Sequence, residues 1–422
     1  MNLLCEIALQ KTFLQSERPA VLEKEVLKGD MELPNWGIKL IRRLEEKGFE
    51  AYAVGGCVRD MLLGKKPEDY DFAVSALPDE TKQALNGVPI FDTGLRHGTV
   101  TAVVDGHTAE ITTYRTESGY SDFRRPDKVG FTRSLSEDLS RRDFTVNAMA
   151  FHPERGLVDC FGGKEDLKNR ILKCVGEPER RFREDALRIL RCLRFSSVLE
   201  FAIEEDTRQA LLKHRELLKK IAPERLQAEF SKLVLGEWAE QVLTEYLPVF
   251  QVFLPEAGQR RSVLNWLPAE KKLRLAGVFS GCTPDETARA LKRLRYDGKT
   301  IRIVTTLERY RQVPLETDRR QARKLVFLLG METAEELLRF REEPKLLKWL
   351  EVIRDQGLCC SLSQLSVNGE DLIRLGYPEG REIGKALNRL LQLVLDETLE
   401  NQKELLLKKA KSWMKLDCWR QE

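Results

Sequence analysis

The spacing of apolar and polar residues changes along the chain, and between residues 50 and 160 it is mixed. The runs EAYAVGG and DYDFAVSA predict short strands, the first ending in a glycine turn. Between them, CVRDMLLG predicts a helix that is closed by Gly64. This part of the chain is therefore expected to form an α/β domain.

The clearest hairpin signal lies in residues 98–115. Two β-rich runs are joined there by Asp105-Gly106, a pair that the type I′ turn prefers because its two central residues need positive φ. A polar loop containing Gly and Pro follows the hairpin. The apolar spacing of residues 134–151 then predicts a helix.

Beyond about residue 165 the strand pattern fades and helical periodicity takes over. At the other end, residues 1–30 resemble an extension before a first helix near Pro34, and Met31 is an alternative natural start. No fixed-period repeat indicates a solenoid. A long all-α portion is thus expected after the α/β domain. The runs that predict its helices are REDALRILRCLRFSSVL, DTRQALLKHRELLKKI, PERLQAEFSKLVL, ETARALKRLRY and GREIGKALNRLLQLVLDETL.

Composition narrows the class of protein. The 422 residues are 42% hydrophobic and 32% charged, enough for a sizeable core, and the net charge is only +3. No run approaches the roughly 18 apolar residues of a membrane span, and the N-terminus lacks the pattern of a signal peptide. Nine scattered cysteines without a CxxC motif favour a reducing cytoplasm. Four widely separated histidines give no indication of a zinc site.

A glycine turn is the first candidate for chemistry. Gly55 and Gly56 stand where the predicted strand meets the predicted helix, so the backbone could approach an anion closely. The helix N-terminus and Arg59, one turn later, would favour a phosphate there. Taken alone, GGxxR is more typical of an ordinary turn with a surface arginine.

A pair of carboxylates follows the glycine turn within about a dozen residues and makes a functional site the better interpretation. Asp69 and Asp71 flank Tyr70 in a predicted strand, where a period of two places both on one face. Such a pair favours divalent cations, and Mg²⁺ prefers carboxylate and phosphate oxygens. Glu110, on the second hairpin strand, is a candidate third carboxylate, although a solvent-facing glutamate is about as good an interpretation.

Two arginine-rich segments complete the candidates. Arg141 and Arg142 precede Asp143-Phe144 and could clamp phosphates or simply form a surface cluster. Residues 180–194 contain six arginines, and a polar side chain recurs there at every third position. An Asp–Arg pair at a spacing of three offers both acceptors and donors for a base edge, while further arginines would face phosphate. The recurring positions are Asp185, Arg188, Arg191 and Arg194.

Together these motifs resemble the class II tRNA nucleotidyltransferase and poly(A) polymerase family of the DNA polymerase beta superfamily. The resemblance covers roughly residues 33–415 and its motifs occur in order at about the expected spacing. They are GGCVRDMLLG, DYD, RRDFTVNAMA, EDALRILRCLRF, PERLQAEF and VNGEDLIRLGYPEGREIGKALNRLLQLVLDETLENQKELLLKKA.

The resemblance implies an α+β fold, in which a nucleotidyltransferase head with a mixed five-stranded sheet precedes an all-α neck, body and tail. Transferred to this chain, it implies an extension at 1–32, the head at 33–165, the neck at 166–238, the body at 239–345 and the tail at 346–422.

The same resemblance implies roles for individual residues. Asp69 and Asp71 match the magnesium-binding aspartates. Gly56 and Arg59 match a triphosphate-contacting glycine and arginine, and Arg142 matches a nucleotide-binding arginine. The neck set would select the incoming base, its aspartate and first arginine pairing with that base; it comprises Asp185, Arg188, Arg191 and Arg194.

The implied activity is addition of CCA to the 3′ end of tRNA from CTP and ATP, without a nucleic-acid template and with release of pyrophosphate. Retention of the loop at residues 115–130, which contains Arg124, Arg125 and Asp127, favours complete CCA addition over CC addition. The alternatives are an A-adding or a CC-adding enzyme, a poly(A) polymerase, and an RNA-binding scaffold whose head has no catalytic activity. The expected partners are tRNA, CTP and ATP with Mg²⁺, and neither a membrane nor DNA.

Overall fold

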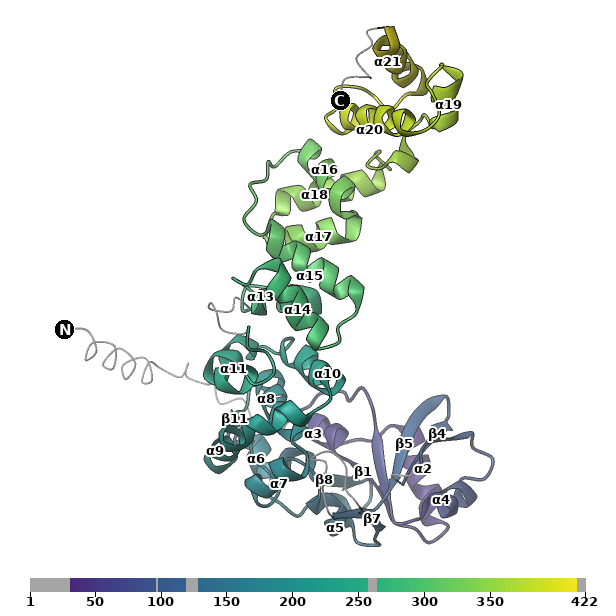
Figure 1. The fold of residues 1–422 in the computed structure, drawn as a ribbon. Coiled ribbons are helices and arrows are strands. Elements are labelled where there is room, and N and C mark those ends of the chain that lie inside the picture. Colours follow the sequence, from purple (N-terminus) through teal and green to yellow (C-terminus); the bar gives the residue numbers. More distant parts are fainter. Residues whose placement is uncertain (1–30, 96–97, 119–127, 257–263, 416–422) are drawn as a thin grey trace, which may run out of the picture. The chain divides into compact units, whose positions relative to one another are not determined.

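The computed structural model describes residues 31–95, 98–118, 128–256, 264–415, and they form two compact units. One unit ends at Ile221 and the other begins at Ala222. This division falls inside the segment expected to be the neck. Each unit is described by itself below (Figure 1).

A mixed sheet organises the first unit. Within the described residues it has seven strands in the order β3-β4-β5-β2-β1-β8-β9, where five were expected. The additional strands are short and lie at or near the sheet edges, where sequence patterning is weak. β2 and β5 are parallel, while the other neighbours are antiparallel. The strands are β1 (Ala51–Val54), β2 (Asp71–Val74), β3 (Ile90–Gly94), β4 (Thr99–Val104), β5 (His107–Thr113), β8 (Met149–His152) and β9 (Gly156–Asp159).

The expected hairpin is confirmed as β4 and β5. Asp105 and Gly106 have φ values of 49° and 80° between the paired Val104 and His107, as a type I′ turn requires. The glycine at the end of helix α3 (Gly56–Leu62) is also confirmed, since Gly64 follows its last turn with φ of 67°.

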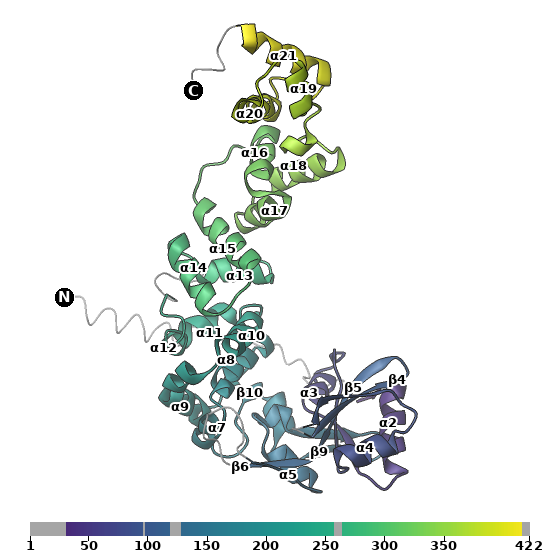
Figure 2. The ribbon, with the colours of Figure 1, turned by 45° about the vertical axis from the view of Figure 1, so that its right-hand side comes forward.

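Helices α2 (Asn35–Glu45) and α4 (Pro78–Ala84) cover one face of the sheet (Figures 1 and 2). α2 buries an apolar stripe that includes Leu40 and Leu44, and its Trp36 ring lies edge-on to Phe72, 5.9 Å between centroids. Packing of this stripe against the sheet accounts for the helical spacing that the sequence shows.

The opposite face is covered only in part. Its buried cluster joins residues of the central strands to the short helix α5 (Leu135–Ser140). Because β2 begins at Asp71 and the cluster takes its Ala73, the start of β2 extends beyond this apolar cover on the same face. The members of the cluster are Tyr52, Val54, Ala73, Tyr114, Leu139 and Ala150.

The predicted helix at 134–151 is wrong over most of its length. The chain forms α5, then a turn, the 3-10 helix η2 (Thr145–Asn147) and strand β8. Both faces of β8 are buried, so its sequence, MAFH, does not alternate between apolar and polar residues. Pairing with β1 on one side and β9 on the other overrides the helical spacing.

The rest of the first unit is mostly helical, although two parallel two-residue strands contradict the all-α description of the neck. A hairpin, β6 (Arg115–Ser118) with β7 (Lys128–Phe131), flanks the expected loop, but Arg124, Arg125 and Asp127 lie outside the described residues. The other elements are α6 (Gly163–Lys168), β10 (Ile171–Leu172), α7 (Pro178–Glu184), α8 (Leu187–Leu199), β11 (Ala202–Ile203), α9 (Glu205–His214) and η3 (Arg215–Lys220).

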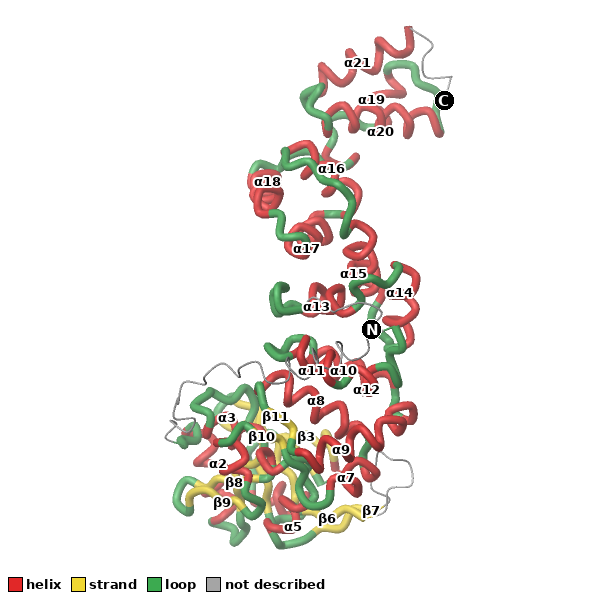
Figure 3. Tube along the Cα trace, turned by 90° about the vertical axis from the view of Figure 1, so that its left-hand side faces the viewer, coloured by secondary structure: helices red, strands yellow, loops and turns green. Residues whose placement is uncertain are grey.

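Helices are the only regular elements in the described part of the second unit, and Figure 3 shows strands in the first unit alone. Among the described helices of either unit, none combines the length and the apolar character needed to cross a bilayer. The second unit contains α10 (Pro223–Leu233), α11 (Ala239–Glu245), α12 (Leu247–Phe250), α13 (Lys271–Val278), α14 (Pro284–Arg293), α15 (Gly298–Tyr310), α16 (Arg319–Leu329), α17 (Met331–Phe340), α18 (Pro344–Asp355), η4 (Leu362–Gln364), α19 (Gly369–Arg374), α20 (Arg381–Leu395) and α21 (Lys403–Lys415).

Candidate active site

Carboxylates meet where β2 and β5 lie side by side. Asp71 and Glu110 are direct partners in the parallel register, so their side chains emerge from the same face about 4.8 Å apart along the hydrogen-bonding direction. Asp69 was expected in the same strand as Asp71. Instead β2 begins only at Asp71, and Asp69 lies in the bend before it. All three residues are exposed.

The neighbouring carboxylates affect the pKa of Asp71. Desolvation of its carboxyl and the nearby charges of Glu110 and Asp69 raise the pKa of Asp71, and only Arg142 opposes them. Negative charge therefore exceeds positive charge at this point of the site. Among the residues that the structure describes, no three His, Cys, Asp or Glu side chains converge closely enough to hold a metal ion by themselves.

The glycine turn lies next to two arginines. Gly55 has φ of 78°, and a Cβ placed on it would come within 2.9 Å of Nη1 of Arg142. A Cβ on Gly56, the first residue of α3, would lie 3.7 Å from Nη2 of Arg59. The missing side chains therefore leave the strand–helix turn open to the guanidinium groups that the sequence associated with it.

Each of these arginines is held by polar partners. Nη1 of Arg59 donates to Oδ1 of Asn147 at 2.7 Å, and its Nε donates to Asp60 at 2.9 Å. Nη2 of Arg142 donates to Asp138 at 3.3 Å. Only 9% of Arg59 is exposed, so its orientation is fixed before any ligand arrives.

Arg141 directly follows helix α5, which ends at Ser140. It donates to Asp138 at 2.7 Å and to Glu117 at 3.1 Å. Burial opposes ionisation of Asp138, but the charges of Arg141 and Arg142 outweigh burial and lower its pKa. Asp138 is thus an ionised anchor for both arginines.

The segment expected to be one arginine-rich helix is broken at Asp185. α7 ends at Glu184, Asp185 has extended backbone angles of −135° and 104°, and α8 begins at Leu187. The carboxylate of Asp185 accepts a hydrogen bond from the N–H of Leu187 at 3.1 Å, as an Asx turn does. The single continuous helix expected here is therefore wrong, although the N–H of Arg188 donates to the carbonyl oxygen of Asp185 at 3.0 Å and keeps the two residues neighbours, as expected.

Arg188 is buried against another acid. Its Nη1 donates to Glu184 at 2.8 Å, and its Nη2 donates to the carbonyl oxygen of Arg141 at 3.0 Å. Burial opposes ionisation of Glu184, but the charge of Arg181 and the bonds and charge of Arg188 prevail and lower its pKa. Arg188 is thereby fastened to both α7 and the turn after α5.

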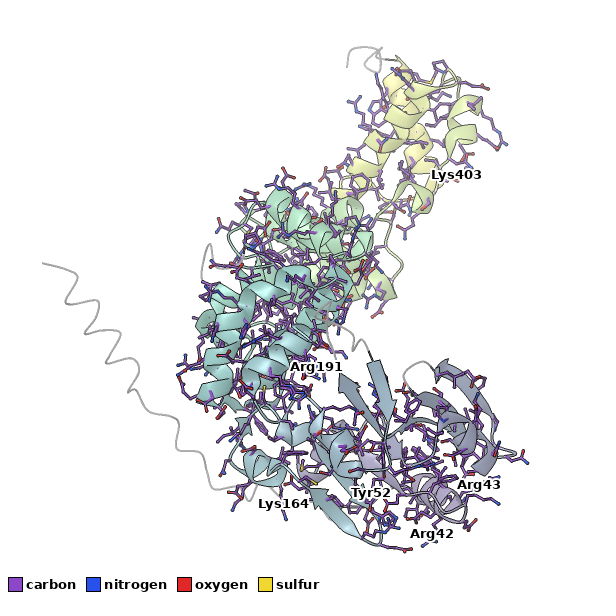
Figure 4. All side chains as sticks on the ribbon, turned by 60° about the horizontal axis from the view of Figure 1, so that its bottom comes forward. Arg42, Arg43, Tyr52, Lys164, Arg191 and Lys403 are labelled. Atoms are coloured by element: carbon purple, nitrogen blue, oxygen red, sulfur yellow. The ribbon has the colours of Figure 1, made fainter. Side chains whose placement is uncertain are left out.

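Arg191 is held by a buried aspartate that the sequence argument did not use for this purpose. Its Nε and Nη2 both donate to Oδ2 of Asp143, at 2.9 and 2.6 Å. Burial opposes ionisation of Asp143, but the charge of Arg191 and its hydrogen bonds lower the pKa of Asp143 to about 2. Figure 4 labels Arg191 among the side chains on the ribbon. The guanidinium of Arg194 lies over the ring of Phe195, 4.0 Å from its centroid.

The structure thus brings the glycine turn and several of the expected arginines around a small set of acids, all within the first unit. Sequence reasoning did not identify Asn147, Glu184 or Phe195. Asn147 links Arg59 to Asp143, since its amide nitrogen donates to Oδ1 of Asp143 at 3.2 Å. The sequence did contain a signal for Glu184. It lies four residues before Arg188, a separation that favours ion pairs even across this break.

Comparison with known proteins gives these features a family. The family model of the Poly A polymerase head domain matches residues 51–173, and that described as "Probable RNA and SrmB- binding site of polymerase A" matches residues 200–257. A model of tRNA nucleotidyltransferase domain 2 matches residues 274–410.

Whole-chain relatives agree with this. A CCA-adding enzyme of Lactobacillus helveticus (strain DPC 4571) is 38% identical over 393 residues, 88% of this chain and 96% of the relative. The crystal structure of the Bacillus stearothermophilus CCA-adding enzyme in complex with CTP is 32% identical, covers 92% of this chain and 100% of that chain, and has a TM-score of 0.78.

The Thermotoga maritima CCA-adding enzyme complexed with tRNA shares the fold, with a TM-score of 0.63 at 23% identity, over 89% of this chain and 94% of that one. Matches at both ends of the chain, and a relative 38% identical along nearly its whole length, establish membership. This chain belongs to the class II CCA-adding enzymes, within the tRNA nucleotidyltransferase and poly(A) polymerase family.

Proposed function

We propose that the protein adds CCA to the 3′ end of tRNA, using CTP and then ATP and releasing pyrophosphate at each step. The observation that supports this best is the pairing of Asp71 with Glu110 on the face of the sheet that extends beyond its apolar cover. We assign Arg142, whose charge lowers the pKa of Asp71, as a phosphate-binding cation beside these carboxylates.

The triphosphate is assigned to the turn between β1 and α3. Gly55 leaves the backbone open there, and Arg59 and Arg142 supply fork donors whose other edges are held by Asn147 and Asp138. Donors fixed in this way lose little freedom when a phosphate binds. They also offset the charge that builds up on the departing pyrophosphate.

Magnesium fits the carboxylates at the start of β2. The raised pKa of Asp71 reflects desolvation and uncompensated negative charge from Glu110 and Asp69, a condition that a bound cation would relieve. Mg²⁺ commonly uses one or two carboxylates together with substrate phosphates, so a protein cage of three ligands is not required. We assign Asp69 and Asp71 to hold it; when bound, it would lower the pKa of a hydroxyl and neutralise phosphate charge.

The reaction is an in-line attack of the terminal 3′-hydroxyl of tRNA on the α-phosphorus of the nucleotide. A new O–P bond forms to the RNA and the hydroxyl proton passes to water. The bond between the α-phosphorus and the oxygen that bridges to the β-phosphorus breaks, and pyrophosphate leaves with the electron pair. Glu110, next to Asp71, is assigned to accept a hydrogen bond from the attacking hydroxyl and orient it.

Base selection is assigned to the α7–α8 junction. Asp185 offers an acceptor in an extended segment. Arg188 follows Asp185 by three residues and is held by Glu184. Arg191 and Arg194 lie further along α8 and are assigned to contacts with the phosphates. The second unit, where tRNA nucleotidyltransferase domain 2 matches, is assigned to tRNA binding, and such a substrate indicates the cytoplasm as the compartment.

Transfer of one labelled CMP to tRNA lacking its CCA end tests the proposed chemistry. The Asp71→Asn variant keeps the size of the side chain and is expected to lose at least a thousandfold in rate while binding tRNA as the wild type does. Arg43→Gln is the control, since its guanidinium donates to the backbone of Asn86 away from these carboxylates. Rapid transfer by Asp71→Asn would overturn the catalytic assignment.

A further inference from the structure

Three guanidinium groups of the proposed nucleotide site share a single aromatic ring. The ring centroid of Phe195 lies 4.0 Å from Cζ of Arg194, 5.3 Å from Cζ of Arg59 and 5.5 Å from Cζ of Arg191. Arg59 comes from α3, whereas the other two come from α8. Phe195 is thus the contact common to the glycine-turn arginine and the arginines of α8.

The surroundings of the ring strengthen these contacts. Only 7% of Phe195 is exposed, and attraction between a cation and an aromatic face grows as water is excluded. On another side, Phe144 meets the ring edge-on at 5.8 Å and 81°. This packing fixes the plane of the ring and therefore the positions that the guanidinium groups can take against it.

Acids and amides hold other sides of two of these arginines. Arg59 donates to Asn147, and Arg191 donates to Asp143. Asn147 also donates to Asp143, so one polar contact of each arginine leads to the same buried carboxylate, while Arg59 also pairs with Asp60. A guanidinium held between that network and an aromatic ring keeps a defined plane, which fixes the directions in which its N–H groups point toward a phosphate.

Three cations around one site repel one another, even though Asp60 pairs with Arg59 and Asp143 pairs with Arg191. Ion pairing alone would neutralise them fully and weaken their attraction for a triphosphate. An aromatic ring attracts each cation without consuming its N–H donors or adding a negative charge. Phe195 can therefore hold the three guanidinium groups together without occupying their N–H donors.

We infer that Phe195 is a positioning residue for the triphosphate of the incoming nucleotide, acting through Arg59, Arg191 and Arg194. This inference rests on the proposed function. It predicts that loss of the ring weakens recognition of the phosphates, whichever base the nucleotide carries.

Equilibrium binding of CTP, ATP and inorganic tripolyphosphate to the full chain tests this without requiring catalysis. The Phe195→Leu variant is expected to raise the dissociation constants of all three by about tenfold, which corresponds to about 1.4 kcal/mol. In steady-state assays the same variant should raise KM for CTP by a similar factor, and by more than it lowers kcat. Phe195→Tyr, which keeps the aromatic face, should restore most of the affinity.

Phe250→Leu in the second unit is the matched control. Phe250 is fully buried and meets the rings of Phe230 and Phe253, so its replacement removes a similar amount of buried aromatic surface. It should lower the unfolding temperature at least as much as Phe195→Leu while leaving tripolyphosphate affinity unchanged. Thermal unfolding of both variants shows whether they are folded at the assay temperature.

The outcomes separate this inference from the proposed function. Unchanged tripolyphosphate and CTP affinity in folded Phe195→Leu, beside a wild type that binds both, would refute the positioning role alone. An equal loss in Phe250→Leu, or no recovery in Phe195→Tyr, would reduce Phe195 to a packing residue. A wild type that binds neither CTP nor tripolyphosphate would refute the proposed function itself.

Discussion

Single buried residues set the geometry of the site, and Asp143 is the clearest case. It lies beneath the arginines and takes hydrogen bonds from Arg191, Asn147 and the backbone N–H of Phe144. The sequence drew attention to the neighbouring arginines as phosphate ligands. Burial of the aspartate, which no local pattern reports, makes it the anchor of the group.

The depressed pKa of Asp143 gives a stability prediction. Because its pKa falls from the ordinary 3.8 to about 2, its charge stabilises the fold above about pH 4 and this contribution is lost as pH falls toward 2. The contribution is on the order of 2 kcal/mol. Asp143→Asn should be less stable by roughly that amount from pH 5 to 7, and the difference should shrink below pH 4. Urea unfolding across this range measures the difference; a gap that stays constant down to pH 3 would contradict the role of the charge.

Gly55 gives a second prediction at this scale. Gly55→Ala places a methyl group near Arg142 and strains a backbone with φ of 78°, so both stability and CTP affinity should fall. Gly48→Ala is the control, because Gly48 has φ of 84° and nothing within 4 Å of an added Cβ. Both variants should lose on the order of 1–2 kcal/mol of stability. Equal CTP affinity in the two, measured by titration, would argue against a close approach of phosphate at Gly55.

At the scale of elements, local signals were sufficient where an element is amphipathic or ends in a distinctive turn. α2 shows its buried stripe in the sequence, and the hairpin of β4 and β5 is marked by Asp105-Gly106. The prediction for the segment of β8 was wrong because a strand buried on both faces has no alternation of apolar and polar residues. Its pairing with β1 also depends on a segment almost a hundred residues away.

The break between α7 and α8 was missed for a different reason. Residues 180–194 have helical propensity throughout, and no Gly or Pro marks the interruption. Asp185 makes the break by accepting from the N–H of Leu187, a local bond that competes with the helix. The chemistry of the segment was thus visible in its residue types, while the positions of those residues required the structure.

Glu184 provides the prediction for this junction. Its carboxylate accepts from three arginines, with Arg188 and Arg181 both at 2.8 Å. Glu184→Gln removes their shared charge and should cost about 2 kcal/mol of stability. It should also raise misincorporation, because Arg188 is no longer fixed at the position assigned to base selection.

Glu179→Gln is the matched control on the same helix. Glu179 pairs with Arg183 and Lys213 at a more exposed position, where such pairs contribute at most about 1 kcal/mol. Incorporation of CMP and AMP at each position, measured with both nucleotides present, compares the two variants. Equal fidelity in Glu184→Gln and the wild type would remove the junction from base selection.

For the whole molecule, the class of fold and the order of its parts could be predicted because several motifs occur in one chain in the family's order. The family models at residues 51–173, 200–257 and 274–410 agree with that order. The number of strands in the sheet and the short β10–β11 pairing could not be predicted, since edge strands of a few residues depend on neighbours distant in sequence.

The net charge of the chain likewise predicts little about the whole molecule. A net charge of +3 gives little indication of an enzyme that handles polyanions. In the folded chain the cations of the candidate site are concentrated and individually anchored by Asp138, Asp143 and Glu184. Local arrangement rather than total charge therefore prepares the protein for its substrates.

The most direct measurement of the central claim is the length of the product formed on a tRNA transcript that lacks CCA. Purified protein and Mg²⁺ would be supplied with CTP alone, ATP alone, or both, and products resolved at single-nucleotide resolution. Two additions with CTP and a third only when ATP is also present are expected. Arrest after two additions with both nucleotides, addition of A only to a supplied CC end, long A tails, or no incorporation would each contradict CCA addition by this protein.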